Sequence, residues 1–504
     1  MLTTTDSLSL TGPLDSATLR RAATPLTVTV DAPARARVDR GRRLFHGLRH
    51  GDGSGSRPIY GATTGFGALV GYAGRPDEAD QCDNTLAHLG AGQGPDLPHE
   101  ICRAALLLRT WSLARGLSGV SGEVIDRLAA MFATTFSPAV PRYGSVGASG
   151  DLIPLAYATQ ALRGRGHAYL DGRRMAAGEA LTAAGLRPLA LDGRDALALV
   201  NGTSVTTAAL ALARDSVRDA HRSLAVLTCL LADLLGCDPG FLDDDLLRAY
   251  GHAGAAHVGA RMRRTLTGLS PSGSRPLQEP YSIRCTPQLL GAAEDALCYV
   301  DGVVSADLGG VSDNPLFFPG HDDGEGKVVH GGNFFGQPAA FAADLLASVT
   351  AQLGNLAERQ LDLLTDPACN GGLPPMLATA PGLQHGLQGV QLAATAFVAE
   401  IRRNATPAGM QSLPTNLHNQ DVVPFGTQAA LRSYDMAELL GLLTGSLALG
   451  LRQAVHVGAR RPTAARCATL LDALSEVLPP VDPDRPLDRD VRTAARLVAA
   501  HESP

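Results

Sequence analysis

Residues 205–235 read VTTAALALARDSVRDAHRSLAVLTCLLADLL. The stretch has few helix-breaking residues, and leucine and alanine, which both favour helices, dominate it. We predict one helix of about 30 residues, which at 1.5 Å per residue would span roughly 45 Å. A helix of this length is typical of a bundle of long helices.

The same pattern returns several times in the rest of the chain. In each run Arg, Glu and Asp fall on one helical face and Leu, Ala and Val on the other. The runs are residues 341–364, 388–403, 427–452, 464–478 and 489–501. Alternating β-branched residues are rare, and the many small residues permit close helix packing. The pattern predicts an all-α fold with a long-helix bundle over residues 201–504.

Residues 1–200 are expected to form a smaller, mostly helical region in front of the bundle. Apolar residues recur at helical spacing in residues 102–115 and 124–136. We also expect an Arg-rich helix near residues 34–48, a short strand at 26–30 and a Gly/Ser-rich turn at 51–56. The sequence thus divides near residue 200.

Composition excludes several classes of function. The 504 residues carry a net charge of −6 without single-sign blocks, which argues against nucleic acid or an anionic membrane as partner. The eight cysteines are scattered without metal-ligand spacing, so we expect no metal site and a reducing cytoplasm. The first residues lack the pattern of a signal peptide, and the most apolar run, 224–235, is too short to cross a bilayer. A soluble cytoplasmic protein is expected.

The segment that carries chemistry lies earlier, between two prolines and the long helix. It is Gly144-Ser145-Val146-Gly147-Ala148-Ser149-Gly150-Asp151-Leu152-Ile153-Pro154. If the amide nitrogen of Gly150 attacks the carbonyl carbon of Ala148 and two waters leave, the backbone closes into a ring. Ser149 then becomes an exocyclic methylidene group, an electrophile that no standard side chain supplies. Glycine allows the close approach because it has no Cβ. Alone, Ala-Ser-Gly is also a common loop sequence.

This segment resembles the signature of the aromatic amino acid ammonia-lyases, the family of histidine, phenylalanine and tyrosine ammonia-lyases and the related 2,3-aminomutases. The resemblance extends from about residue 60 to 427 through several motifs in order. It implies the cofactor 4-methylidene-imidazol-5-one (MIO), formed from Ala148, Ser149 and Gly150. It also implies a homotetramer whose active sites draw on more than one chain.

Eliminating ammonia needs a base at the β-carbon of the substrate, and the resemblance assigns that role to Tyr60. This residue opens the segment Tyr60-Gly61-Ala62-Thr63-Thr64-Gly65-Phe66-Gly67, which is similar to the catalytic-tyrosine loop of the family. A tyrosine with a pKa near 10 in water is a poor base unless dipoles or positive charge lower that value. The glycines would make the loop mobile, like a lid. Without the resemblance, Tyr60 reads as a half-buried aromatic in a turn.

Further motifs supply the other groups that the resemblance implies. Asn201, in an Asn-Gly pair, would hydrogen-bond the cofactor or the substrate amine. Arg284 has the planar guanidinium that grips a carboxylate through two hydrogen bonds. Tyr281, three positions earlier, looks like the second active-site tyrosine. Asn314 would help to hold the substrate carboxylate, and Phe334 would pack against the ring or the arene. Apart from the resemblance, these are ordinary turn and surface residues.

Two positions bear on the substrate. His88-Leu89 stands where phenylalanine lyases tend to have Phe-Leu and tyrosine lyases His-Leu, and a histidine can hydrogen-bond a phenol. If the imidazole is buried, phenylalanine should be the poorer substrate, because the ring would lose its partner. Gln420 replaces the glutamate that histidine lyases carry, so histidine falls behind the aromatic amino acids. We expect L-tyrosine to be converted to trans-p-coumarate and ammonia.

Asn416 departs from this pattern. Many phenylalanine and tyrosine lyases have glutamate there, whereas asparagine is seen in some 2,3-aminomutases. An aromatic 2,3-aminomutase therefore stays open as an alternative, as do phenylalanine and histidine ammonia-lyases. A non-catalytic helical scaffold is disfavoured, because Tyr60, Ser149, Asn201 and Arg284 are all present. Direct attack by Ser149 is disfavoured because no triad pattern accompanies it.

Overall fold

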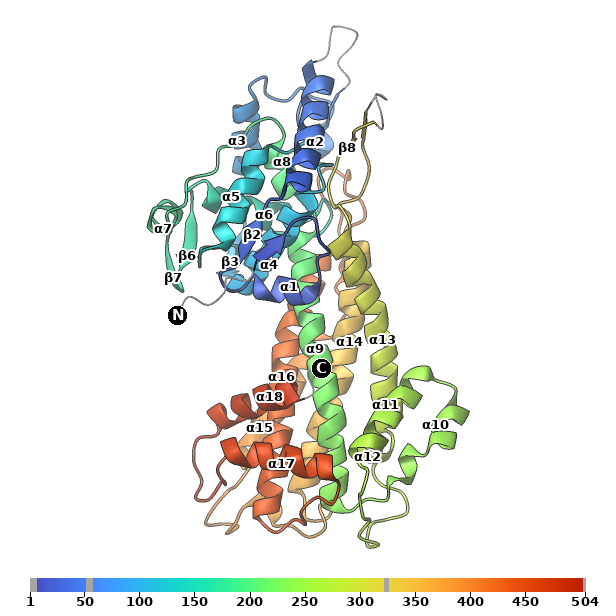
Figure 1. Cartoon of the computed structure of the whole chain (residues 1–504). Helices are drawn as coiled ribbons and strands as arrows, with labels where there is room; N and C mark the ends of the chain where they lie inside the picture. The colour runs from blue at the N-terminus through green and yellow to red at the C-terminus, as the bar shows by residue number, and fades with distance from the viewer. Residues whose placement is uncertain (1–6, 51–57, 321–325, 502–504) are drawn as a thin grey trace. The chain divides into compact units, whose positions relative to one another are not determined.

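The computed structural model describes residues 7–50, 58–320 and 326–501 (Figure 1). The chain divides into two compact units, each assembled from separate stretches of sequence. The first unit contains residues 1–212, 302–343 and 407–431, and the second contains 213–301, 344–406 and 432–504. The division that the sequence suggests near residue 200 remains a prediction about folding domains.

The first unit is built of short helices with small two- and three-stranded sheets. Its helices are α1 (Ser16–Arg21), α2 (Ala32–His50), α3 (Glu78–His88), α4 (His99–Leu113), α5 (Gly122–Phe132), α6 (Leu152–Leu162), α7 (Ala177–Ala183) and α8 (Asp195–Val200). Its strands are β1 (Ser7–Ser9), β2 (Thr27–Thr29), β3 (Gln93–Asp96), β4 (Ser137–Pro138), β5 (Pro141–Tyr143), β6 (His167–Leu170), β7 (Arg173–Ala176), β8 (Leu316–Phe318) and β9 (Lys327–Val329). Strands β1 and β2 pair in parallel, whereas β3–β5, β4–β6–β7 and β8–β9 pair antiparallel. The short 3₁₀ turns of this unit are η1 (Gly67–Leu69) and η4 (Gly409–Gln411).

Helix α4 forms the centre of the first unit. Every residue from Ile101 to Leu113 is buried, including Trp111, the single tryptophan of the chain. Arg103, although charged, is only 1 % exposed and donates to the carbonyl oxygens of Ala22, Thr24, Phe132 and Phe136. These carbonyls include the ends of α1 and α5, where cations are favoured. Burial lowers the pKa of the Arg103 guanidinium to about 10.

The second unit consists mainly of helices, several of them long. They are α9 (Ser204–Leu235), α10 (Asp244–Tyr250), α11 (Ala253–Thr265), α12 (Tyr281–Arg284), α13 (Thr286–Gly309), α14 (Gln337–Thr365), α15 (Gln388–Asn404), α16 (Gly426–His456), α17 (Ala465–Val477) and α18 (Asp488–His501). Helices α9, α13, α14 and α16 each have one end in the first unit. Two 3₁₀ turns, η2 (Pro239–Leu242) and η3 (Pro375–Leu377), complete the unit. The predicted long helices are therefore confirmed, and the fold is mostly helical.

The helix predicted over residues 124–136 was too long at its end. Helix α5 stops at Phe132, because the Phe132 carbonyl accepts from the amide of Leu26 at 2.8 Å and from Arg103 at 3.2 Å. With that carbonyl bound elsewhere, the chain leaves the helix and pairs as β4 with β6. The turn expected at residues 51–56 lies outside the described residues.

Asp233 explains why the apolar run near the end of α9 contains a charge. Its buried carboxylate accepts from the backbone amides of Thr463 at 3.0 Å and Ala464 at 2.8 Å, and from Arg460 at 3.3 Å. Ala464 precedes α17 and has no side chain that can cap it, so Asp233 satisfies the start of that helix from another element. Among the described residues, only residues 195–235 are apolar and long enough to span a membrane, and 94 % of their most apolar window is buried inside the protein.

Replacing Asp233 with Ala should destabilise the second unit. The change leaves the amides of Thr463 and Ala464 and the Arg460 guanidinium without their acceptor, which costs about 3 kcal/mol in the free energy of unfolding. Urea denaturation followed by circular dichroism measures the effect. Asp472→Ala is the control, because Asp472 forms an exposed pair with Arg461 that contributes about 0–1 kcal/mol. Equal losses in both variants would contradict the capping role.

Candidate active site

Two adjoining cavities in the first unit bring together residues that are far apart in the sequence. The inner cavity has a volume of about 40 Å³, and the outer one has a volume of about 840 Å³. Both are lined by Tyr60, Phe66, His88, Leu89, Ser149 and Leu152. The inner cavity adds Asn201 and Phe334, and the outer one adds Asn416 and Gln420. The described part of the chain thus gathers most of the predicted site residues in one place.

The Ala148-Ser149-Gly150 segment lies between β5 and α6, with Ala148 and Gly150 buried and Ser149 half-buried. The Oγ atom of Ser149 accepts a hydrogen bond from Nε2 of Gln420 at 2.6 Å. Gly150 has φ +72°, and a Cβ at this position would stand 2.4 Å from the carbonyl oxygen of Gly202. Only glycine fits there, because the backbone of residue 202 occupies the space of a side chain.

Asp151 anchors this segment, although the sequence analysis assigned it no role. Its carboxylate is fully buried and accepts from the hydroxyls of Ser145 at 2.9 Å, Thr206 at 2.8 Å and Thr427 at 2.7 Å, and from the Thr206 amide at 2.8 Å. Its own amide donates to the Gly202 carbonyl at 2.7 Å. Burial raises the pKa of Asp151, and the four hydrogen bonds oppose that rise. The carboxylate joins the segment to the first turns of α9 and α16.

Tyr60 lies in the loop before η1, and its phenol oxygen accepts from the Gly67 amide at 2.9 Å. Burial raises the pKa of Tyr60, and the Gly67 hydrogen bond lowers it by less. The dipoles of this unit therefore do not provide the lowered pKa that a base requires. The Tyr60 amide donates to Nε2 of His330 at 3.2 Å, which fixes the start of the loop against the segment after β9.

Asn201 ends α8, where it faces the inner cavity and is 2 % exposed. Its Nδ2 donates to the backbone carbonyl of Asn314 at 2.8 Å. The Oδ1 atom is buried and has no hydrogen-bond partner among the described residues. A buried amide oxygen without a donor is costly in a folded protein, so this atom is suited to accept from a group that enters the cavity. The Asn314 side chain itself accepts from the Gly331 amide at 2.8 Å.

A buried ion cluster supports these two asparagines. Asp313 and Arg194, both fully buried, form two parallel hydrogen bonds of 2.9 Å. Arg109 lies 3.7 Å from Asp313 and donates to the Ser312 carbonyl at 2.5 Å. Such a cluster holds two segments in one geometry, because breaking it would leave an unpaired charge in the core. Arg194 immediately precedes α8 and Asp313 precedes Asn314, so the cluster fixes both Asn201, which lines the inner cavity, and Asn314, which lines neither cavity but accepts from Asn201.

His88, at the end of α3, lines both cavities, and its ring stacks on Phe66 with centroids 5.6 Å apart. Its Nδ1 lies 3.0 Å from the Asn84 carbonyl. Because a carbonyl only accepts, this hydrogen bond requires a proton on Nδ1, and in the tautomer that carries its single proton there, Nε2 is an acceptor. Discrimination against phenylalanine would require a buried imidazole, but His88 is exposed in this chain while Leu89 is buried. The desolvation of a His88 ring without a phenol partner therefore contributes less to discrimination against phenylalanine than it would for a buried imidazole.

The remaining predicted residues are divided between the units. Asn416 has φ +56°, and its Oδ1 is 3.4 Å from the Ala68 amide in the Tyr60 loop. Phe334 is half-buried at the inner cavity. Tyr281 and Arg284 form α12 in the second unit, with the guanidinium 4.7 Å from the tyrosine ring centre. Tyr281 is 71 % exposed, and neither residue lines the two cavities of the first unit.

The residues around Ser149 fit the cofactor that the resemblance implies. Gly150 adopts a backbone that only glycine tolerates, Gln420 donates at the Ser149 side chain, and Asn201 has an unpaired oxygen in the same cavity. Ala148, Ser149 and Gly150 would form the ring, and Asn201 and Gln420 would lie beside it. The arrangement suits a small ligand with an apolar body and a few polar groups.

Comparisons with known proteins show the family of the chain. The model of the family described as aromatic amino acid lyase matches residues 14–476. The chain is 39 % identical over 473 residues to tyrosine ammonia-lyase from Cereibacter sphaeroides, covering 87 % of this chain and 88 % of that protein. It is 37 % identical over 455 residues to histidine ammonia-lyase from Bradyrhizobium diazoefficiens, covering 89 % of this chain and 86 % of that protein.

Among solved structures, tyrosine aminomutase from Streptomyces globisporus superposes with a TM-score of 0.89 at 30 % identity, covering 98 % of this chain and 97 % of that one. This likeness extends over both compact units. The relatives named as ammonia-lyases are carbon–nitrogen lyases. The chain therefore belongs to the aromatic amino acid lyase family, and it is a carbon–nitrogen lyase.

Proposed function

We propose that the enzyme removes ammonia from L-tyrosine to give trans-p-coumarate, with Ala148, Ser149 and Gly150 closed into MIO. The cavity shared by Tyr60, Ser149, Asn201 and His88 is the observation that carries the proposal. MIO supplies an electrophilic carbon that makes the substrate amine a better leaving group. Tyr60 would take the β-proton, and Asn201 would bind the amine through its free Oδ1.

The substrate carboxylate requires a cation, and we assign this role to Arg284 with help from Asn314. Arg284 and Tyr281 belong to the second unit and are not among the residues that line the two cavities of the first, and Tyr281 is largely exposed. We therefore infer that a neighbouring copy supplies them in a homotetramer. Exposed apolar side chains of the second unit, such as Leu392 at 68 % and Leu383 at 88 %, support an interface there. A nearby guanidinium would also lower the pKa of Tyr60 toward that of a useful base.

We place the enzyme in the cytoplasm, where its cysteines would stay reduced. Within the described residues no disulfide joins any of the eight, and five of them are buried. Burial raises the pKa of Cys82 and Cys467 to about 12, which keeps both as unreactive thiols.

The aminomutase alternative also has a specific observation in its favour. Asn416 contacts the loop that carries Tyr60, through the Ala68 amide, and solved relatives include tyrosine aminomutase and the phenylalanine aminomutase of Pantoea agglomerans. A mutase would use the same residues but retain the arylacrylate long enough to return the amine at the β-carbon. Release of free p-coumarate against formation of a β-amino acid distinguishes the two activities.

Incubation with L-tyrosine should raise the near-ultraviolet absorbance of p-coumarate in the wild type and not in Tyr60→Phe. Loss of a general base lowers the rate by about 10² to 10⁴-fold. Intact mass is the control, because both proteins should lack the mass of two waters relative to their translated sequences. Unchanged turnover in Tyr60→Phe would remove Tyr60 from catalysis. If phenylalanine or histidine but not tyrosine is turned over, that amino acid replaces tyrosine as the proposed substrate. A β-amino acid as the main product would favour the mutase.

His88→Phe should reduce the preference for tyrosine over phenylalanine by about fivefold in kcat/KM. The variant loses the Nε2 acceptor for the phenol hydroxyl, and a hydrogen bond of this kind contributes about 1 kcal/mol. Steady-state rates with both substrates measure the ratio. The intact mass should stay the same, which separates specificity from damage to the cofactor segment. A ratio that does not change would exclude His88 as the selective group.

Asp151→Asn should lower the fraction of chains that close the ring. An asparagine side chain has one acceptor oxygen, whereas four donors converge on the Asp151 carboxylate. Mass spectrometry should therefore find chains that keep both waters, with activity falling in proportion. Asp96→Asn is the matched control, since Asp96 accepts from Tyr169 and Arg174 away from the cavity. Complete dehydration in Asp151→Asn would show that the anchor is not needed for closure.

A further inference from the structure

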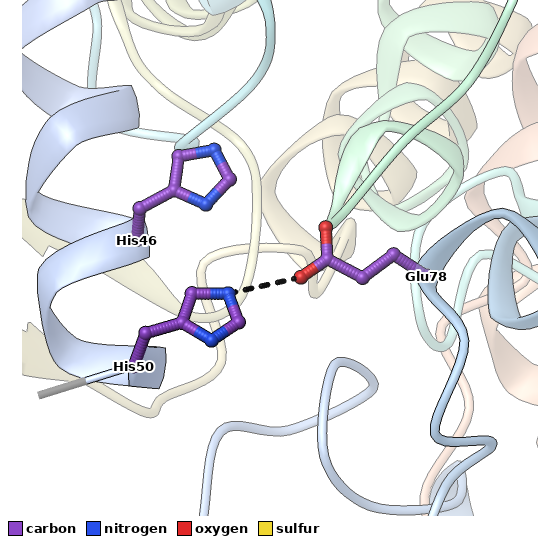
Figure 2. A group of neighbouring side chains, drawn as sticks. All are labelled: His46, His50 and Glu78. Atoms are coloured by element: carbon purple, nitrogen blue, oxygen red, sulfur yellow. Dashed lines mark ion pairs between the residues drawn. The ribbon is translucent and has the colours of Figure 1, made fainter.

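A second cluster of chemically active side chains lies in the first unit, outside the proposed active site. His46 and His50 occupy consecutive turns of α2, and Glu78 is the first residue of α3. One ligand atom from each of the three lies within 4.8 Å of the others (Figure 2). None of the three lines the two cavities around Ser149. Within the described residues, this is the one group of its kind.

The geometry of the two histidines is that of a pair preorganised on a helix. Residues four apart lie on the same helical face, one turn above the other. The two rings are nearly parallel, at 17°, with centroids 6.0 Å apart. Both rings extend toward Glu78, which approaches from the opposite element (Figure 2). The side chains are half-buried in His46 and Glu78 and exposed in His50, so an ion can reach them from solvent.

The surroundings of Glu78 keep its carboxylate in place and supply a second carboxylate. Glu78 is 2.7 Å from Nε of Arg49 and 3.4 Å from Nε2 of His50, both through Oε1. Burial raises the pKa of Glu78, and the neighbouring Asp192 carboxyl group raises it further. Two acidic groups held this close repel each other when both are charged, and a divalent cation would relieve that repulsion.

Two imidazoles and one or two carboxylates form a ligand set for a borderline divalent transition metal. Zinc takes His nitrogen at about 2.0–2.1 Å and carboxylate oxygen at about 2.0–2.2 Å, usually in a tetrahedron. The atoms must therefore move together from their present spacing, by rotation about the side-chain torsions of the exposed His50 and the half-buried His46 and Glu78. Two guanidinium groups lie nearby: Arg42 pairs with Asp192 at 3.1 Å and with Asp195 at 3.5 Å, and Arg49 pairs with Oε1 of Glu78. A bound cation would therefore share the Glu78 and Asp192 carboxylates with these arginines.

We propose that His46, His50 and Glu78, assisted by Asp192, bind one zinc-like divalent cation that ties α2 to α3. His50 ends the helix before the segment that carries Tyr60, and Glu78 begins the helix after it. Arg49 already joins the two sides of this segment through the carbonyls of Ala62 at 3.2 Å and Pro76 at 3.4 Å. A bound cation adds a coordinate link at the same place. The site is a structural link, separate from the proposed chemistry.

Untagged protein titrated with Co²⁺ tests the proposal, because tetrahedral cobalt has visible absorption that reports its ligands. We expect one ion per chain at micromolar affinity, without the near-ultraviolet absorption of cobalt bound to thiolate, and displacement by Zn²⁺. The double variant His46→Asn/His50→Asn should lose this binding. His99→Asn should keep it, because His99 pairs with Glu100 on another exposed surface.

Thermal melting provides a second measurement that does not depend on enzyme activity. Zn²⁺ should raise the melting temperature of the wild type and of His99→Asn, and leave that of the double variant unchanged, because an ion that binds the folded state stabilises it. The double variant without metal should melt like the wild type without metal, which excludes misfolding as the cause. Absence of stoichiometric binding, or binding and stabilisation that persist in the double variant, would overturn the proposal.

Discussion

The buried carboxylate of Asp151 is the interaction on which the cavity depends. It collects hydrogen bonds from residues 145, 206 and 427, which belong to three distant parts of the sequence. A buried charge is tolerated only when donors surround it, so these three segments are held together by the need to satisfy one group. Since Asp151 follows Gly150 directly, the same need sets the position of the tripeptide. The backbone at Gly202 then closes against it.

A second arrangement of buried charges fixes Asn201 in the inner cavity. Arg194 and Asp313 pair without exposure to water; Arg194 precedes the helix that ends at Asn201, and Asp313 precedes Asn314, whose carbonyl accepts from Asn201. Because Arg194 and Asp313 neutralise each other, the side-chain amides of Asn201 and Asn314 are not needed to hydrogen-bond to these charges. Asn201 keeps one oxygen unused as a result. The cavity therefore presents one hydrogen-bond acceptor, the Oδ1 atom of Asn201, on a rigidly held segment. Such an arrangement favours selective binding.

The sequence predicted the helical elements well and the polar supports poorly. Helical periodicity is a local property, so the runs at 205–235 and 388–403 correspond closely to α9 and α15. The end of α5 at Phe132 was missed because it depends on Leu26 and Arg103, which are distant in sequence. Asp233 appeared only as an interruption of an apolar run, since its partners lie in residues 460–464.

For the candidate site too, sequence motifs identified individual residues but not the properties that depend on contacts with distant parts of the chain. Motif resemblance located Tyr60, Ser149, Asn201 and His88, and the cavity contains all four. It could not indicate that burial raises the pKa of Tyr60 or that His88 is exposed, because solvent exposure is a property of the assembled chain. Asp151 and Asp313 were overlooked for a related reason: an acid next to a glycine or before Asn-Pro reads as an ordinary turn or cap residue. The histidines His46 and His50 likewise gave no indication of a metal site, because Glu78 lies far from them in the sequence.

Trp111, fully buried in α4, has a consequence for how this enzyme can be observed. It is the single tryptophan among 504 residues, and it belongs to the first compact unit. Intrinsic indole emission is therefore a reporter of that unit alone. Unfolding confined to the long helices of the other unit would leave the fluorescence unchanged but would lower the ellipticity. A comparison of the two signals can therefore follow the unfolding of each unit separately.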